Sequence, residues 1–388
     1  MSIIRNYTIN FFGNEKKYIT NCIDTKWIST NGKYVDKFSK KLQKFLKSKY
    51  VIPLNSGTAA LHLALRAINV EKNDEVIVPT ITFIASVNAI KYCNAFPIFI
   101  DTDKDFIIDE NKVIKFLQNN TTTKNHFTIN KKTKKIIKAI IVVSTWGISK
   151  DLKKLKKVCK LMNIKIIEDA AESLGSKINK KKFSGTFGDI SCISFNANKI
   201  ITAGGGGALI TNNKEIAKKV YYLSVQAKDN SKYFIHNDVG YNYRMTNLHA
   251  AIGLAQLEKI NTIINFKRTI SLKYLNNLKN VKKALLLYND KKKISKYNCW
   301  MNILSIDKKK FNIIKFIDYM NFNKVDVRPV WKLNHLQQQY KKCEKFEITN
   351  AQKLSSNSIC LPSSTSLSFR EINQITDLII SYINNEKY

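Results

Sequence analysis

The chain has 388 residues, of which 44% are hydrophobic, and it contains only 13 Gly and 5 Pro. This composition excludes a disordered or collagen-like chain, and the length allows two or three domains of ordinary size. Basic residues number 65 against 29 acidic ones, giving a formal net charge of +36, and no apolar run reaches the ~18 residues that a membrane span needs.

Between about residue 50 and residue 210, short β-rich runs alternate with helical patterns. Strands are predicted at residues 75–79, 96–100, 135–143, 164–168, 189–194 and 207–211. Helices are predicted at residues 61–68, 84–91 and 151–162, the last after an Asp or Ser cap. This alternation predicts a mainly parallel sheet with helices on both faces, which binds its ligands at the carboxyl ends of the strands. Residues 119–135 are predicted to form an exposed loop or hairpin.

After residue 250 the pattern changes to longer helices and isolated strands. Helices are predicted at residues 250–264, 267–280 and 373–385, and short strands at 300–306 and 324–328. We therefore expect two domains. Residues 1–252 form a large domain that includes the N-terminal segment, and residues 253–388 form a smaller α+β domain.

The positive charge alone suggests a nucleic-acid-binding protein. However, only six of the 65 basic residues are Arg, the usual reader of bases and phosphates, and the 59 Lys are scattered along the whole chain. We therefore expect a solvated lysine-rich surface and no nucleic-acid partner, with binding of a polyanion as the alternative.

The cysteines and histidines indicate neither disulfides nor a metal site. The seven Cys are widely spaced without a C-x-x-C pair, as expected of reduced thiols in the cytoplasm. The five His include no H-E-x-x-H motif, so no metal is expected. Residues 1–14 lack the apolar core of a signal peptide, which also favours a cytoplasmic protein without membrane association.

Two segments combine polar residues with a predicted strand end or helix start. Residues 54–60 form a small polar turn before a helix, where backbone N–H groups and the hydroxyls of Ser56 and Thr58 could bind an anion. Residues 166–172 place Glu168 and Asp169 at the end of a strand, where a carboxylate could hold a cationic ring nitrogen. Each segment, taken alone, could also be a helix cap without a ligand.

A third segment runs from Ser194 to Lys199 and is followed by four glycines at residues 204–207. A lysine drawn into a pocket after a buried strand becomes nucleophilic. The glycines match neither a Rossmann fingerprint nor a P-loop, so both readings are rejected. Together the three segments supply a phosphate cradle, a carboxylate for a pyridinium nitrogen and a Schiff-base lysine, which is what a pyridoxal 5′-phosphate (PLP) enzyme needs.

These motifs resemble the DegT/DnrJ/EryC1/StrS family of sugar aminotransferases. The motifs that carry the likeness span nearly the whole chain, and in order they are GNE (13–15), WIS (27–29), NSGTAAL (55–61), TITFIAS (80–86), EDAAE (168–172), GTFGD (185–189), SFNANK (194–199), GYNYRMT (240–246), RPVW (328–331) with His335, and CLPSS (360–364). The resemblance implies the fold-type I architecture of PLP-dependent transferases, similar to aspartate aminotransferase. Its large domain has a mainly parallel seven-stranded sheet, and its small C-terminal domain is α+β.

The resemblance also implies a role for each matching residue. Lys199 would bind PLP and move the proton, and Asp169 would keep the pyridine nitrogen protonated, which makes these two the predicted catalytic residues. The predicted cofactor-binding residues are Ser56, Gly57, Thr58, Phe83, Asp169, Glu172, Ser194, Asn196, Lys199 and Asn242. Asn242 would reach the cofactor of a neighbouring subunit, so a homodimer with shared active sites is expected. The predicted substrate-binding residues are Tyr243, Arg244, Arg328, Trp331 and His335.

Some of these residues have structural alternatives. Phe83 could belong to the core, Arg244 could form a structural ion pair, and Trp331 and His335 could be packing residues.

The favoured branch consists of 4-aminotransferases that act on nucleotide-linked 4-keto-6-deoxy-N-acetyl sugars in bacillosamine and legionaminic acid synthesis. It is suggested by Gln226, Ala227, Trp300 and residues 328–331. The implied reaction moves the amino group of L-glutamate to C4 of such a sugar, with UDP as the expected nucleotide. One alternative is a PLP-dependent sugar dehydratase of the same fold, which carries His in place of Lys199. The other is a non-catalytic polyanion-binding protein.

Overall fold

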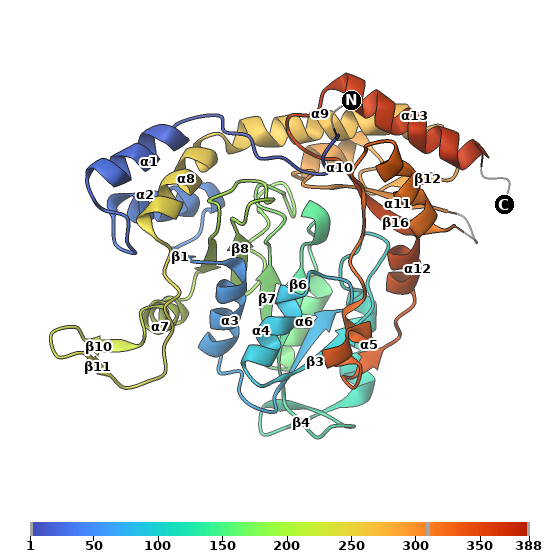
Figure 1. Cartoon of the computed structure of the whole chain (residues 1–388). Helices are drawn as coiled ribbons and strands as arrows, with labels where there is room; N and C mark the ends of the chain where they lie inside the picture. Colours follow the sequence, from blue (N-terminus) through green and yellow to red (C-terminus); the bar gives the residue numbers. More distant parts are fainter. Residues whose placement is uncertain (1–2, 308–310, 386–388) are drawn as a thin grey trace.

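The computed structural model describes residues 3–307 and 311–385, and an eight-stranded sheet forms its centre (Figure 1). The strands in spatial order are β1 (Tyr50–Leu54), β9 (Gly207–Thr211), β8 (Ile190–Ser194), β7 (Lys165–Asp169), β6 (Ile137–Val143), β2 (Glu75–Pro79), β3 (Phe96–Ile100) and β15 (Lys345–Phe346). Strand β9 is antiparallel to β1 and β8, and all pairs from β8 to β15 are parallel. The first seven strands form the sheet implied by the resemblance, and the two-residue β15 adds an eighth from the C-terminal region.

Helices cover both faces of this sheet. One face packs against α3 (Gly57–Ala67), α4 (Ala85–Tyr92) and α7 (Lys214–Ser224). The other face packs against two groups, α5 (Glu110–Asn120) and α6 (Lys153–Leu161) near β3, and α1 (Glu15–Asp24), α2 (Lys33–Leu46) and α8 (Asn247–Glu258) near β1. Neighbouring residues of one strand point to opposite faces, and both faces are buried, so the strands are nearly continuous apolar runs.

The C-terminal region builds a second, four-stranded antiparallel sheet. Its strands in spatial order are β12 (Ala284–Leu286), β13 (Asn302–Ile306), β16 (Ser358–Leu361) and β14 (Arg328–Pro329). It shares a core with α9 (Ile260–Leu278), α11 (Ile313–Phe322) and α13 (Phe369–Asn385). The predicted domain boundary between residues 252 and 253 falls inside α8, and the division into domains stays a prediction.

The remaining elements are short. They are α10 (Lys291–Lys296), α12 (Asn350–Asn357), the 3-10 helices η1 (Thr145–Gly147), η2 (Asn334–Leu336) and η3 (Gln338–Tyr340), and the hairpins of β4 (Thr121–Lys124) with β5 (Phe127–Asn130) and β10 (Lys228–Asn230) with β11 (Ile235–His236). The β4–β5 hairpin spans residues 121–130, inside the segment 119–135 where an exposed loop or hairpin is predicted. The β10–β11 hairpin projects from the body of the molecule (Figure 1).

Three local expectations differ from the structure. Strand β1 was not among the predicted strands, and its Pro53 is tolerated because β1 is the edge of the sheet. The predicted Asp or Ser cap of α6 is wrong, because Leu152 is the N-cap residue and makes no side-chain bond. The strand predicted at residues 324–328 is reduced to Arg328 and Pro329 of β14, while Val325 forms an isolated bridge with Ile4.

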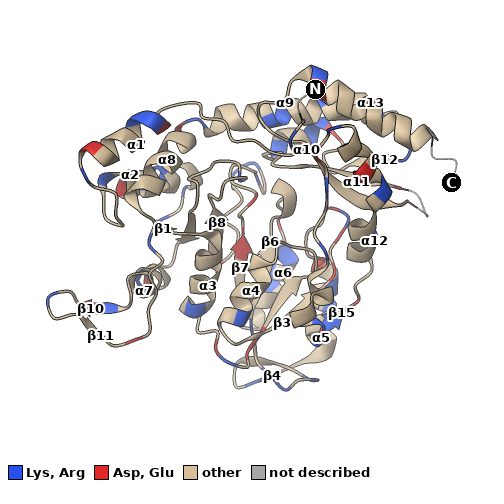
Figure 2. Ribbon diagram, viewed as in Figure 1, with Lys and Arg blue, Asp and Glu red and all other residues tan. Residues whose placement is uncertain are grey.

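Basic residues are spread over all layers of the molecule (Figure 2). Of the lysines whose side chains the structure describes, only Lys199 and Lys267 are buried. Within residues 3–307 and 311–385, no helix is long and apolar enough to cross a bilayer.

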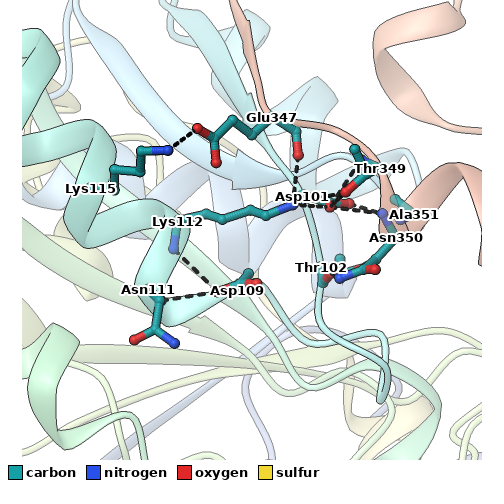
Figure 3. Close-up of polar contacts among 10 residues, drawn as sticks. All are labelled: Asp101, Thr102, Asp109, Asn111, Lys112, Lys115, Glu347, Thr349, Asn350 and Ala351. Carbon is teal, nitrogen blue, oxygen red and sulfur yellow. Dashed lines mark hydrogen bonds and ion pairs between the residues drawn. The ribbon is translucent and has the colours of Figure 1, made fainter.

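A buried carboxylate ties the C-terminal region to the large sheet (Figure 3). Asp101, at the end of β3, accepts hydrogen bonds from Nζ of Lys112 at 2.6 Å and from the backbone N–H groups of Thr349, Asn350 and Ala351 at 2.8–3.0 Å. These five residues are called the Asp101 cluster below. They hold the start of α12 against the sheet, because the carboxylate supplies acceptors that the first N–H groups of a helix lack.

Candidate active site

A cavity of about 330 Å³ lies at the carboxyl ends of β7 and β8 and the N-terminus of α3. All the predicted cofactor-binding residues except Asn242 line it, and Trp331 is the one predicted substrate-binding residue among its lining. Its other lining residues include Asn55, Thr82, Asn198, Gly205, Gly206 and Trp300. The cavity therefore brings together the three segments that the sequence analysis singled out.

The N-terminus of α3 forms one end of the cavity. Ser56 is the N-cap residue, and its hydroxyl accepts a bond from the N–H of Ala59 at 3.0 Å. A Cβ at Gly57 would lie 2.8 Å from Cβ of Ser194, and one at Gly207 would lie 2.5 Å from the backbone nitrogen of Gly57. Glycine at these two positions lets α3, β8 and β9 meet closely, where a helix N-terminus favours an anion.

Asp169 ends β7 and is 6% exposed. The Ser86 hydroxyl donates to its Oδ2 at 2.6 Å, and the N–H of Ala171 donates to its Oδ1 at 3.1 Å. Burial raises the pKa of Asp169, and the nearby Lys199 opposes this shift only in part. A cationic partner in the cavity would restore the preference of this carboxylate for its ionised form.

The neighbouring Glu168 points to the other side of β7 and has a different role. Its carboxylate accepts bonds from the N–H groups of Gly185 and Phe187, both at 2.8 Å, and from the hydroxyls of Ser184 and Ser191 at 3.0 and 3.1 Å. It therefore anchors the 184–191 segment. Of the two carboxylates in the strand-end motif, only Asp169 faces the cavity.

Lys199 follows β8 and is 9% exposed. Its Nζ lies 3.3 Å from Oε1 of Glu172 and 4.4 Å from the centre of the Trp300 ring. The other carboxylate oxygen of Glu172 accepts the N–H of Trp146 at 2.7 Å. Burial raises the pKa of Glu172 to about 7, despite the opposing effect of Lys199. Glu172 is thus a buried group that can accept or release a proton near neutral pH beside the lysine amine.

Aromatic rings form one side of the cavity. Trp146 stacks on Trp331 with ring centres 4.0 Å apart and on Trp300 at 5.9 Å, and Phe83 lies 6.1 Å from Trp331. Phe83 is 53% exposed, as expected of a ring that faces a ligand and not of a core residue. Three of the four tryptophans of the chain therefore belong to one stack at this site.

The other predicted site residues lie outside the cavity lining. Asn242 is exposed, and Tyr243 lines an adjacent hollow that shares Ser56 and Thr58 with the cavity. The Arg244 guanidinium lies 4.9 Å over the ring of Tyr221, and Arg328 makes a 3.4 Å ion pair with Asp326. His335 is buried, and its Nδ1 bonds to the Thr80 hydroxyl at 2.6 Å, so the structure does not bring this ring to the cavity. Substrate-binding roles for these residues stay predictions.

Comparison with known proteins identifies the chain. The sequence model of the DegT/DnrJ/EryC1/StrS aminotransferase family matches residues 12–380. The chain belongs to this family. GDP-perosamine synthase of Escherichia coli O157:H7 is 36% identical over 388 residues, which cover 100% of both chains.

Two further proteins are similar to this DegT-family chain. UDP-4-amino-4,6-dideoxy-N-acetyl-β-L-altrosamine transaminase of Campylobacter jejuni is 35% identical over 235 residues, 60% of this chain and 58% of that protein. A Streptococcus pneumoniae sugar aminotransferase solved in its PLP form has a TM-score of 0.82 at 24% identity, and the match covers 97% of this chain and 99% of that one. The predictions of fold type, family and PLP cofactor are confirmed at the family level.

The residues of this DegT-family site fit PLP. The N-terminus of α3 suits a phosphate, Phe83 offers a ring face, and Asp169 lacks the cation that a pyridinium nitrogen would supply. Lys199 would supply the amine that holds the cofactor. When bound, PLP supplies the electron sink that amino-group transfer needs.

Sequence reasoning missed two residues that shape the site. Ser86 donates to Asp169 from the first turn of α4, and Trp146 joins the aromatic stack and donates its N–H to Glu172. Two weak features of the sequence could have pointed to them: Ser86 is the last residue of the TITFIAS motif, and Trp146 is one of only four tryptophans in the chain. The sequence around each residue does not indicate which residue it contacts, because the two contacting residues are far apart in the chain.

Proposed function

We propose that this protein is a nucleotide-sugar 4-aminotransferase, which moves the amino group of L-glutamate to C4 of a 4-keto-6-deoxy sugar carried on a nucleoside diphosphate. The observation that supports it best is the meeting of Lys199, Asp169 and Glu172 in one cavity beside the N-terminus of α3. Lys199 would hold the cofactor and carry the proton, Asp169 would hold the ring nitrogen, and Glu172 would orient the lysine amine.

Arginines beside the cavity support a diphosphate-linked substrate. Arg5 and Arg328, two of the six arginines in the chain, line a hollow that shares Asn198 with the cavity. Guanidinium groups match the geometry of phosphate oxygens. Replacing Arg328 by Met should raise KM for the nucleotide sugar about tenfold and leave KM for glutamate unchanged, since the loss of a hydrogen bond to a charged group costs about 1.5 kcal/mol or more.

Two nucleotides compete for this role. The full-length likeness to a GDP-perosamine synthase favours GDP, and the partial likeness to a transaminase of a UDP-linked N-acetyl sugar supports the UDP expected from the sequence. A panel of GDP-, UDP- and dTDP-linked 4-keto-6-deoxy sugars, incubated with glutamate and analysed by mass spectrometry, separates them. An aminated product identifies the substrate, while a deoxygenated product would support the dehydratase alternative.

Covalent trapping tests the role of Lys199 directly. Borohydride reduction of the PLP-loaded protein should fix the cofactor on the peptide that contains Lys199, and on none of the other lysine peptides. Lys199→Ala should abolish both the adduct and amino transfer. Reduction that leaves Lys199 unmodified would contradict the proposed chemistry.

The exposed Asn242 supports a homodimer with shared sites. In one chain it lies outside the cavity, and its backbone oxygen accepts a bond from Asn55 at 3.2 Å, so the segment that carries Asn242 is fixed beside the cradle. If two subunits share their sites, Lys199→Ala and Asn242→Ala chains are each inactive alone but regain part of the activity when co-expressed. A monomer, or mixed dimers without activity, would contradict shared sites.

A further inference from the structure

Lys267 of α9 is buried although no catalytic role explains it. Its side chain is 1% exposed, and its Nζ donates to the backbone oxygens of Trp300, at 3.1 Å, and Ser363. The same Nζ lies 4.8 Å over the ring of Tyr7. Among the described residues no carboxylate makes an ion pair with it, so backbone oxygens and one ring satisfy this amine.

A buried lysine without a counter-ion is costly and needs a structural reason. The chain has 59 lysines, and among those described only Lys267 and Lys199 are taken out of the solvent. Burial lowers the pKa of Lys267 to about 7. A lysine amine donates to two acceptors in either protonation state, so its bonds to Trp300 and Ser363 persist through that pH range.

Both aromatic residues that contact Lys267 also hold the segment that carries the catalytic lysine. The Tyr7 hydroxyl donates to the backbone oxygen of Lys199 at 2.9 Å, and Nε1 of Trp300 donates to the backbone oxygen of Asn198 at 2.6 Å. The Trp300 ring in addition lies 4.4 Å from Nζ of Lys199. Two routes of direct contact therefore lead from Lys267 to the backbone of residues 198 and 199.

We propose that Lys267 is a positioning residue that fixes Tyr7 and Trp300, which in turn hold the peptide groups of Asn198 and Lys199 and so aim the catalytic amine. It extends the proposed function by a residue that does not line the cavity itself. The segment needs such support, because residues 195–206 include no helix or strand and end in glycines. Without the contacts from Tyr7 and Trp300, the position of the Lys199 amine would vary while the cavity stayed in place.

The test compares Lys267→Met with the native protein. Methionine keeps most of the length and volume but donates no hydrogen bond. We expect kcat to fall about 10- to 100-fold with little change in KM for the nucleotide sugar, since small misplacements of a reacting group cost this much. In the cofactor-free protein, an amine-acylating reagent should modify Lys199 at least about threefold faster, measured by peptide mass spectrometry, because local opening exposes it.

Lys112→Met is the matched control. Lys112 also donates to a backbone oxygen, that of Glu347 at 2.8 Å, and it belongs to the Asp101 cluster (Figure 3). No hydrogen bond or ion pair joins it to Lys199. This variant should lower Tm while leaving kcat and the labelling of Lys199 unchanged. If Lys267→Met behaves like this control, the proposal is overturned.

If Lys267→Met does not fold, a second variant, Tyr7→Phe, tests the proposal. Tyr7→Phe removes only the hydroxyl that donates to Lys199, and it should lower kcat roughly 3- to 10-fold and speed the labelling of Lys199. Unchanged kcat and labelling would overturn the proposal. A native protein without aminotransferase activity would contradict the proposed function, while the labelling rates of cofactor-free Lys199 would still decide the role of Lys267.

Discussion

Glu172 is a buried carboxylate whose two oxygens have different partners, the amine of Lys199 and the N–H of Trp146. Asp169, three residues earlier, is held instead by Ser86 and Ala171. These contacts give two carboxylates of one motif separate tasks. Asp169 faces the cavity, where the proposed function places the ring nitrogen of the cofactor, and Glu172 lies beside the lysine amine.

The raised pKa of Glu172 predicts a pH-dependent cost in stability. Its pKa rises from 4.5 to about 7 on folding, so between these values the folded protein keeps a proton that the unfolded chain releases. Below pH 4.5 this group does not affect the free energy of unfolding. As the pH rises from 4.5 through 7, the free energy of unfolding falls, and above that range the total loss is up to about 3 kcal/mol. Glu172→Gln removes this loss, so in the cofactor-free protein its stability relative to the native chain should be greater at pH 8 than at pH 5.

Urea unfolding of both proteins at the two pH values measures this difference. Glu215→Gln is the control, because Glu215 is exposed on α7 and pairs with the exposed Lys218. It should show no pH-dependent difference. An equal gap between Glu172→Gln and the native protein at both pH values would refute the argument.

For single residues, the sequence indicates those that lie at or after the end of a predicted strand. It does not indicate residues that reach the site from distant parts of the chain. Asp169 ends one buried strand and Lys199 follows another, so the sequence could single them out, and the structure brings both to one cavity. Ser86, Trp146 and Lys267 act on partners 83, 26 and 33 residues away, and no local pattern encodes such pairs. For the same reason the sequence could not show that His335 bonds to Thr80, 255 residues away.

Among the elements, the N-terminus of α3 forms the end of the cavity that suits a phosphate, and β1 and β9 pair beside it. Gly207 begins β9 and pairs with Leu54, the last residue of β1. A Cβ there would lie 2.4 Å from the carbonyl carbon of Ser56, which is backbone and cannot turn aside. The position therefore requires glycine for space, because its φ does not lie in the left-handed region.

Gly207→Ala should destabilise the protein by about 1–3 kcal/mol, the usual range for an overpacked site, and weaken PLP binding. Denaturant unfolding and cofactor titration measure the two effects. Gly205→Ala is the control for stability, since its Cβ would meet its nearest atoms at 3.9 Å, and it should change the free energy of unfolding by less than about 0.5 kcal/mol. Equal effects of the two substitutions would contradict the steric argument.

Six of the eight strands of the large sheet are predicted from the sequence, because strands buried on both faces are nearly continuous apolar runs. Strand β1 escaped prediction because Pro53 interrupts its pattern, and β15 because two residues carry no periodicity. The cap of α6 failed for another reason. Asp151 lies one residue before the N-cap, and its carboxylate pairs with Lys153 and accepts a bond from Asn179.

For the whole molecule, the charge of +36 is widely distributed, because Lys and Arg occur in every layer of the fold (Figure 2). Such an excess of like charge repels itself, and salt screens the repulsion. Raising the ionic strength from about 0.01 M to about 0.15 M shortens the Debye length from about 30 Å to about 8 Å. Tm, measured by scanning calorimetry over this range, should therefore rise, and a constant or falling Tm would show that the charges are already balanced by local pairing.

From the contacts of the Asp101 cluster, we expect the Asp101 carboxylate to hold the C-terminal region in place. Asp101→Asn should cost about 3 kcal/mol, because the partly exposed Lys112 and three N–H groups lose a charged acceptor that is itself fully buried. Proteases should then cut faster between β15 and α12, as limited proteolysis can show. Asp307→Asn is the control, since its exposed pair with Lys353 at 3.3 Å should contribute less than about 1 kcal/mol.

The Asp101 cluster also has a consequence for how the chain is made. The carboxylate leaves the ribosome long before its partner Ala351, which follows 250 residues later. At about 5–20 residues per second, roughly 10–50 s pass before that partner is synthesised. During this time the nascent chain carries a finished apolar β3 with an open edge and an uncapped Asp101. We therefore expect the N-terminal half to need chaperone protection during translation, and the molecule to become protease-resistant only after its last quarter has emerged.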